Sequence, residues 1–236
     1  MPGLIPRLLF YLGAVSYTHL DVYKRQKYCI VSLVFHDQAD SLALAQDALE
    51  KDLGVKSLPI IPFHASPLMY GKDAYKDLDM ETRKKLLLSF EAFCRRAPFT
   101  CKVFAYRRSE VPSPVDFIVR LKRDLVVFLT ENLDYFQAFS KVKIYYDNGQ
   151  QMVTEALHGA IDFILSKEAV LYRAADSREY LLSQVADCVC TLELTDLKFR
   201  NDELTNTDVK VFGTNYRSFK NNHLKHFRRK VLNGRL

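Results

Sequence analysis

The pattern of apolar and polar residues alternates between short strand-like runs and longer amphipathic stretches. Runs rich in β-branched and aromatic residues predict strands, whereas apolar residues that recur every three to four positions predict helices. Three prolines between residues 58 and 68 predict a loop there. Strands are expected at 28–35, 101–106, 141–146 and 169–172, and helices at 41–53, 80–96, 114–139, 151–165 and 178–198. Strands that alternate with helices predict an α/β fold.

Two acidic residues stand where an unpaired charge is unfavourable. Asp187 interrupts an apolar predicted helix, and Asp147 closes an apolar predicted strand. Gln184 and Thr191 lie at helical spacing from Asp187, so these three residues form one polar stripe. Two carboxylates, one at a strand end and one on a late helix, are suited to binding Mg²⁺ or Mn²⁺. The alternatives are a core Asp187 bonded by neighbouring side chains and a simple turn or helix cap at Asp147.

Three runs of the chain, taken together, resemble one protein family. They are residues 63–68 (Phe-His-Ala-Ser-Pro-Leu), residues 144–150 (Ile-Tyr-Tyr-Asp-Asn-Gly-Gln) and residues 178–194, which contain Ser-Gln-Val-Ala-Asp-Cys. In this order and spacing they resemble the bacterial family known as domain of unknown function 3800, over a match from about Lys27 to the C-terminus. The resemblance implies a ribonuclease H-like mixed sheet flanked by helices, with a helical insertion between the second and third core strands.

The resemblance also implies a metal-dependent nuclease, by analogy between folds. Asp147 and Asp187 would then hold Mg²⁺ or Mn²⁺, which activates water and neutralises charge on a phosphodiester. Members of the family usually open with a strand that ends in Asp-Glu-Ser-Gly and supplies a central metal-bridging carboxylate. No such run occurs in this chain. We therefore expect a nuclease fragment that lacks its genuine first strand and is inactive as written.

Residues 15–26 (Val-Ser-Tyr-Thr-His-Leu-Asp-Val-Tyr-Lys-Arg-Gln) stand where that strand is expected. This run resembles translated sequencing-adapter DNA that contaminates some gene sequences. We accordingly treat residues 1–26 as an artefactual segment and assign Asp21 no ligand role; the alternative is a genuine but divergent strand. A strand at residues 8–15 or 18–23 is expected only as a replacement that fills the gap in the sheet.

Length and composition predict one globular domain. The chain has 236 residues, of which 48% are hydrophobic and 26% charged, both ordinary values. We assign residues 27–200 to a ribonuclease H-like domain and residues 201–236 to a basic helical extension of it. No run approaches the roughly 20 apolar residues of a membrane span, so we expect a cytoplasmic protein without a membrane partner. The five cysteines are scattered, which predicts buried thiols in a reducing compartment and no zinc site.

The net charge of +6 is concentrated near the C-terminal end. From Arg217 onward there are seven basic residues and no acidic one. A basic helix with aromatic residues between its charges is suited to gripping the phosphate backbone of DNA or RNA. The alternative is that Phe219, His223 and Phe227, spaced four apart, dock this helix onto the domain while its charges remain in solvent. Docking is the favoured interpretation.

Three more residues are candidates for the site. His64 lies in the proline-rich loop, where it would shuttle a proton or contact a phosphate. Arg107 and Arg108 end a predicted strand, where they would clamp a phosphate, and Gln184 of the polar stripe is a further substrate contact. The plainer alternatives are a loop histidine bonded to its own backbone and solvated charges at a strand end.

Two functions therefore compete. The first is a metal-dependent phosphodiester hydrolase with Asp147, Asp187 and His64 as its catalytic residues. The second is a non-catalytic nucleic-acid-binding or regulatory module on the same fold. The second function predicts binding that weakens with salt and survives the substitution Asp187→Asn.

Overall fold

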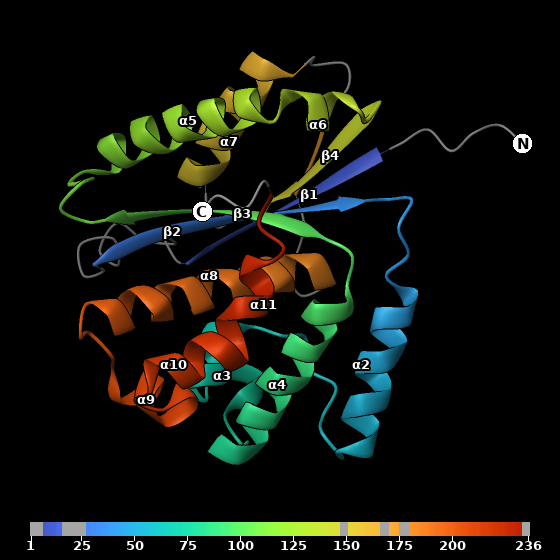
Figure 1. Cartoon of the computed structure of the whole chain (residues 1–236), viewed down its shortest axis with the longest axis vertical. Coiled ribbons are helices and arrows are strands. Elements are labelled where there is room, and N and C mark those ends of the chain that lie inside the picture. Colours follow the sequence, from blue (N-terminus) through green and yellow to red (C-terminus); the bar gives the residue numbers. More distant parts are fainter. Residues whose placement is uncertain (1–6, 16–26, 147–150, 166–169, 175–179, 233–236) are drawn as a thin grey trace, which may run out of the picture.

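The framework of the protein is one five-stranded sheet of mixed direction with helices on both faces (Figure 1). The computed structural model describes residues 7–15, 27–146, 151–165, 170–174 and 180–232. The strands are β1 (Arg7–Val15), β2 (Tyr28–Asp37), β3 (Thr100–Arg107), β4 (Lys141–Tyr146) and β5 (Val170–Ala174). Their order across the sheet is β3-β2-β1-β4-β5. The expected α/β fold class is confirmed.

The central strand is β1, which pairs antiparallel with β2 and parallel with β4. On the two flanks, β3 pairs antiparallel with β2 and β5 pairs parallel with β4. Residues 7–15 therefore occupy the central position of the sheet. This is the segment expected as a replacement. Its apolar run Leu-Leu-Phe-Tyr-Leu supplies ladder partners to the strands on both sides.

Helices cover the sheet in two layers (Figure 1). One layer contains α5 (Pro114–Glu131), α6 (Leu133–Gln137) and α7 (Gln151–Ile164). The other layer contains α2 (Ala43–Val55), α3 (Ala65–Tyr70), η1 (Asp73–Tyr75), α4 (Met80–Arg96), α8 (Leu181–Arg200), α9 (Asn206–Phe212), α10 (Tyr216–Phe219), η4 (Lys220–Leu224) and α11 (Lys225–Arg228). Within the described residues, no helix combines the length and apolar character needed to cross a membrane.

Side-chain alternation along β2 builds two cores. Ile30 and Val34 join the core on the α8 side, whereas Val31, Leu33 and Phe35 join the core beneath α5 and α7. Because both faces of β2 are covered, its sequence is a nearly continuous apolar run. The five cysteines are buried free thiols, as expected.

Two predicted segments differ in detail from the observed elements. Helix α3 forms inside the predicted loop, and Pro67 lies in its first turn, where a backbone N–H would lack a helical partner in any case. The long helix predicted at 114–139 is divided at Asn132. The side-chain amide of Asn132 donates to the Phe128 carbonyl (2.7 Å) and competes with the helical bonding pattern there.

The C-terminal segment, defined as residues 216–232, docks onto the α8 side of the domain through its aromatic face. Phe219 and Phe227 are 0% and 2% exposed. The His223 ring packs on Phe219, and its Nδ1 atom lies 2.8 Å from the buried Glu91 carboxylate of α4. The expected docking through Phe219, His223 and Phe227 is therefore confirmed. The charges do not all remain in solvent, because Arg228 is ion-paired with buried acids.

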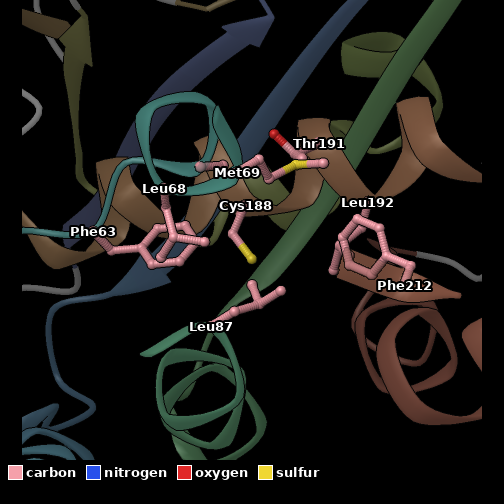
Figure 2. Close-up of a pocket in the computed structure, with 9 residues that line it drawn as sticks. Phe63, Leu68, Met69, Leu87, Cys188, Thr191, Leu192 and Phe212 are labelled. Carbon is pink, nitrogen blue, oxygen red and sulfur yellow. The ribbon is translucent and has the colours of Figure 1, made fainter. Parts of the chain in front are cut away.

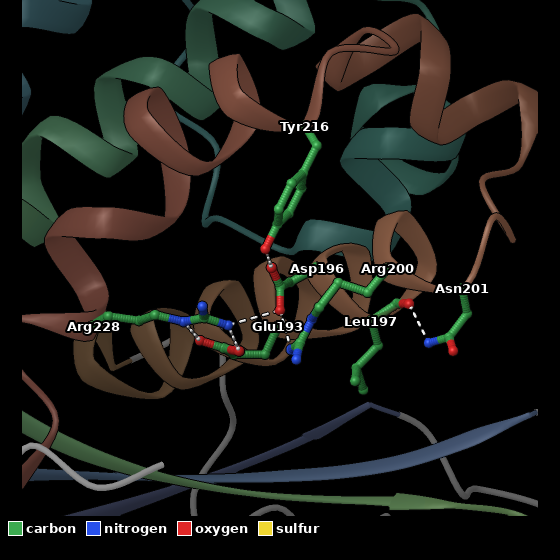
Figure 3. Close-up of polar contacts among 7 residues, drawn as sticks. All are labelled: Glu193, Asp196, Leu197, Arg200, Asn201, Tyr216 and Arg228. Atoms are coloured by element: carbon green, nitrogen blue, oxygen red, sulfur yellow. Dashed lines mark hydrogen bonds and ion pairs between the residues drawn. The ribbon is translucent and has the colours of Figure 1, made fainter.

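A buried polar network also holds this segment to α8 (Figure 3). The guanidinium of Arg228 donates to the carboxylates of Glu193 and Asp196, at 2.8 Å in each case. Asp196 is fully buried, and it also accepts hydrogen bonds from the Tyr216 hydroxyl (2.9 Å) and from Arg200. Two buried acids thus have two guanidinium partners, so neither charge is left uncompensated.

We predict that Arg228→Ala strongly destabilises the fold. Removing this guanidinium leaves Glu193 without its bidentate partner in a buried position, which should lower the free energy of unfolding by about 3 kcal/mol. The matched control is Arg229→Ala at the neighbouring exposed position, which should change stability by less than about 0.5 kcal/mol. Urea unfolding of both variants measures the difference. Equal stability of the two variants would contradict the role given to Arg228.

Candidate functional site

The candidate site lies where α8 meets the loop that leads into α3. The Gln184 side-chain oxygen accepts the Phe63 backbone N–H (2.9 Å), and Asp187 Oδ2 accepts the Ala65 backbone N–H (2.7 Å). These two acceptors are one helical turn apart on α8, and their donors are two residues apart in the loop. The polar stripe predicted on the helix therefore anchors the loop predicted to carry His64.

A third side chain fixes the same loop. The Tyr75 hydroxyl accepts the His64 backbone N–H (3.0 Å) and donates to the Pro62 carbonyl (2.8 Å). Burial raises the pKa of Tyr75 to about 12, so this hydroxyl keeps its proton at neutral pH. The backbone on both sides of His64 is thus held, while its imidazole remains more than half exposed.

Two of the predicted catalytic residues come together. His64 Nε2 lies 4.0 Å from Asp187 Oδ2, and the two side chains are 55% and 23% exposed. The contact joins two runs that are more than a hundred residues apart in the sequence. Both groups face a surface accessible to solvent, so together they can bind a cation or move a proton.

The Asp187 carboxylate is not fully compensated by the protein. Burial raises its pKa above the usual range, while the charge of His64 and the Ala65 N–H act in the opposite direction. Oδ2 is engaged by the loop, and no hydrogen bond from a described residue reaches Oδ1. One oxygen of this acid therefore remains available to a ligand.

Contacts with the sheet set the position of α8. The Ser32 hydroxyl of β2 donates to the Ala186 carbonyl (2.7 Å), directly before Asp187. At the start of the helix, the Tyr180 ring packs against the rings of Tyr11 and Tyr145, with centroids 6.1 Å and 5.0 Å away. The first turns of α8 thus lie across β2, β1 and β4.

The central strand passes close to the turn that carries Asp187. Gly13 of β1 is the register partner of Ser32, the residue bonded to Ala186. Because Leu9 and Tyr11 belong to the core on the α8 side, alternation places position 13 on that side too. Strand β1 contains no acidic residue. A glycine therefore stands on the central strand beside the candidate site.

The other predicted site residues are placed differently. Asp147 lies outside the described residues. Arg107 donates to the side chain of Asn201 at the end of α8, about 20 Å along that helix from Asp187 by helical rise. Arg108 follows in the chain and donates its backbone N–H to the Lys27 carbonyl (2.8 Å). The two arginines thus do not converge on Asp187. Gln184, expected to contact substrate, holds the loop through its side-chain oxygen.

The interior behind the site is closed. Phe63, Leu68, Leu87 and Cys188 surround an apolar gap between α3, α4 and α8 (Figure 2). Its volume of about 10 Å³ is no larger than the space for one water molecule. The packing behind Cys188 therefore leaves no room for a ligand.

The described residues do not form a complete metal site. No group of three or more His, Cys, Asp or Glu side chains within them could hold a metal ion. Sequence reasoning also missed Tyr75 and Ser32, whose partners lie 11 and 154 positions away in the chain. No local pattern signals such contacts, because they depend on how distant elements pack.

Comparison of the chain with protein-family models, with curated proteins and with solved structures finds no match in any of the three.

We predict that Asp187→Asn stabilises the metal-free protein at neutral pH. Because the pKa of Asp187 is higher in the folded state than in the unfolded state, the ionised carboxylate opposes folding. The protonated carboxyl favours folding below about pH 4, and this contribution is lost as pH rises through the folded pKa. Asparagine keeps an acceptor for the Ala65 N–H without the charge. Urea unfolding in chelator should show a gain in stability at pH 7 that disappears near pH 4.

The control for this measurement is Asp187→Ala. It removes both the charge and the acceptor, so the Ala65 N–H loses its partner and the gain should be absent. An Asp187→Asn protein that is less stable than the parent at pH 7 would show that the fold compensates the charge.

Proposed function

We propose that this chain is an incomplete metal-dependent phosphodiester hydrolase with a ribonuclease H-like fold. The proposal rests on one observation above all, which is the placement of Asp187 beside the central strand through the contacts Gly13 to Ser32 and Ser32 to Ala186. The mixed sheet with helices on both faces agrees with the fold that the family resemblance implies. That resemblance, to the domain of unknown function 3800 family, is part of the proposal.

Asp187 and Asp147 are the proposed ligands of Mg²⁺ or Mn²⁺. Asp187 fits this role because its Oδ1 is available and because a cation would offset the desolvation of its charge. Asp147 directly follows the last residue of β4, a strand that runs parallel to β1. A bound cation would activate water and neutralise charge that develops on the phosphodiester.

His64 is the proposed proton carrier. Its imidazole stands at the solvent side of Asp187, and the backbone around it is fixed by Tyr75 and by the Ala65 contact. A histidine so placed can protonate a leaving oxygen or hydrogen-bond a phosphate oxygen. Gln184 acts indirectly, because it positions the loop that carries His64.

The proposed site lacks a carboxylate on the central strand, so we expect negligible hydrolysis by the chain as written. The second candidate function, a non-catalytic nucleic-acid-binding or regulatory module, is favoured by this same lack of an acid on β1. The two functions differ in their dependence on Asp187, which a hydrolase requires and a binding module does not.

We predict that Gly13→Asp creates a divalent-cation site. The new carboxylate would lie on the α8 side of β1, next to the turn that carries Asp187. Isothermal titration with Mn²⁺ should show binding at least about tenfold tighter than in the parent, or about 1.4 kcal/mol. Cleavage of single-stranded DNA or RNA in Mn²⁺ is the accompanying readout.

Two controls make this test specific. Gly13→Asn has nearly the same shape without the charge, and Gly13→Asp combined with Asp187→Asn removes the partner acid. Both should bind Mn²⁺ as weakly as the parent. If Gly13→Asp binds Mn²⁺ no better than Gly13→Asn, the proposed site is wrong.

A further inference from the structure

The C-terminal segment runs alongside α4 and onto the first residues of β3 (Figure 1). Successive residues of the C-terminal segment contact successive residues of the stretch from α4 to β3. His223 bonds Glu91, the Lys230 ammonium donates to the Ala97 carbonyl (2.6 Å), and the Cys101 N–H donates to the Lys230 carbonyl (2.8 Å). The relative position of the segment and α4 is therefore fixed at several points.

This arrangement brings unneutralised cations together. Arg95 follows Glu91 by one helical turn on α4, and Lys225 and Arg229 lie one turn apart on the facing segment. All three side chains belong to exposed residues. We call Arg95, Lys225 and Arg229 the cationic patch.

Nearby acids do not neutralise the patch. Residues 216–232 contain no Asp or Glu. On α4, Arg95 acts electrostatically on Glu91, but that acid is fully buried and bonded to His223. Arg228, next in sequence to the patch, is committed to Glu193 and Asp196, which leaves Arg229 outside that network.

The half-buried ring of His226 lies close enough to several of these charges for them to lower its pKa. Its pKa is lowered to about 4, first by burial and then by the positive charges of Arg95, His223, Lys230 and Arg229. Cations from α4 and from the C-terminal segment therefore act on one point of the surface. Such repulsion persists in a stable fold, and it would be relieved by a bound anion.

We propose that the cationic patch binds the phosphate backbone of a nucleic acid. Two guanidinium groups and an ammonium group on neighbouring helices offer several cations to a phosphate backbone, and arginine is well suited to phosphate oxygens. The patch itself indicates that the ligand is an anion. The identification of that anion as a nucleic acid rests on the proposed function.

The test is fluorescence anisotropy with labelled 20-nucleotide single-stranded DNA and RNA, using the full chain in chelator so that no cleavage occurs. The parent should bind with salt-dependent affinity. The triple variant Arg95→Gln, Lys225→Gln, Arg229→Gln should bind at least about tenfold more weakly and reduce the slope of log K against log salt by about 2 to 3.

The matched control removes the same charge from exposed lysines elsewhere, with Lys51→Gln, Lys76→Gln and Lys122→Gln. It should lose much less affinity than the patch variant. Equal losses in the two triple variants would overturn the patch, because net charge alone would then explain binding. Binding of the parent to anionic lipid vesicles but not to either nucleic acid would also overturn it.

Nuclear magnetic resonance of the His226 ring gives a local readout. Nucleic acid bound at the patch should raise the pKa of His226, because phosphates offset the charges of Arg95 and Arg229. An unchanged pKa on binding would contradict the location. The two proposals fail separately: loss of selective weakening in the patch variant would overturn the patch, whereas the metal site is tested by Mn²⁺ binding to Gly13→Asp, which does not involve Arg95, Lys225 or Arg229.

Discussion

The hydrogen bond from Ser32 to the Ala186 carbonyl is the contact on which the candidate site depends. It fixes α8 against the sheet one residue before Asp187, and Ser32 is itself the register partner of Gly13 on the central strand. A buried hydroxyl in an apolar strand requires such an acceptor, so the contact is strongly selected once the elements pack. Because α8 is fixed in this way, its next polar side chains, Gln184 and Asp187, reach the same loop and position His64.

The energetics of Asp187 agree with a functional role. A single backbone N–H and a partly exposed histidine only partly offset the cost of desolvating its charge. In contrast, Asp196 on the same helix is fully buried but is met by Arg200, Arg228 and Tyr216. The protein therefore compensates one acid of α8 completely and leaves the other with a free oxygen. An incompletely compensated acid of this kind is typical of a position that awaits a ligand.

Sequence patterns predicted strands β2 to β5 and the longer helices, because apolar periodicity reflects burial directly. They also singled out Asp187 and His64, whose residue types are unusual for their surroundings. They failed where packing decides the outcome: the helix break at Asn132, the short helix at Pro67 and the separation of Arg107 from Asp187. The central strand at residues 7–15 agrees with the replacement strand expected at 8–15, although its pairing depends on the strands beside it.

In this interpretation, the metal site lacks a carboxylate on the central strand β1, whereas Asp187 on α8 is already in place. A crystal structure of the Gly13→Asp variant grown with Mn²⁺ tests this most directly, because anomalous scattering locates the ion. We expect one Mn²⁺ peak at about 2.1 Å from Asp187 Oδ1 and from the new carboxylate at position 13. An ordered carboxylate at position 13 with no peak beside Asp187, or with Mn²⁺ bound only elsewhere, would contradict the interpretation.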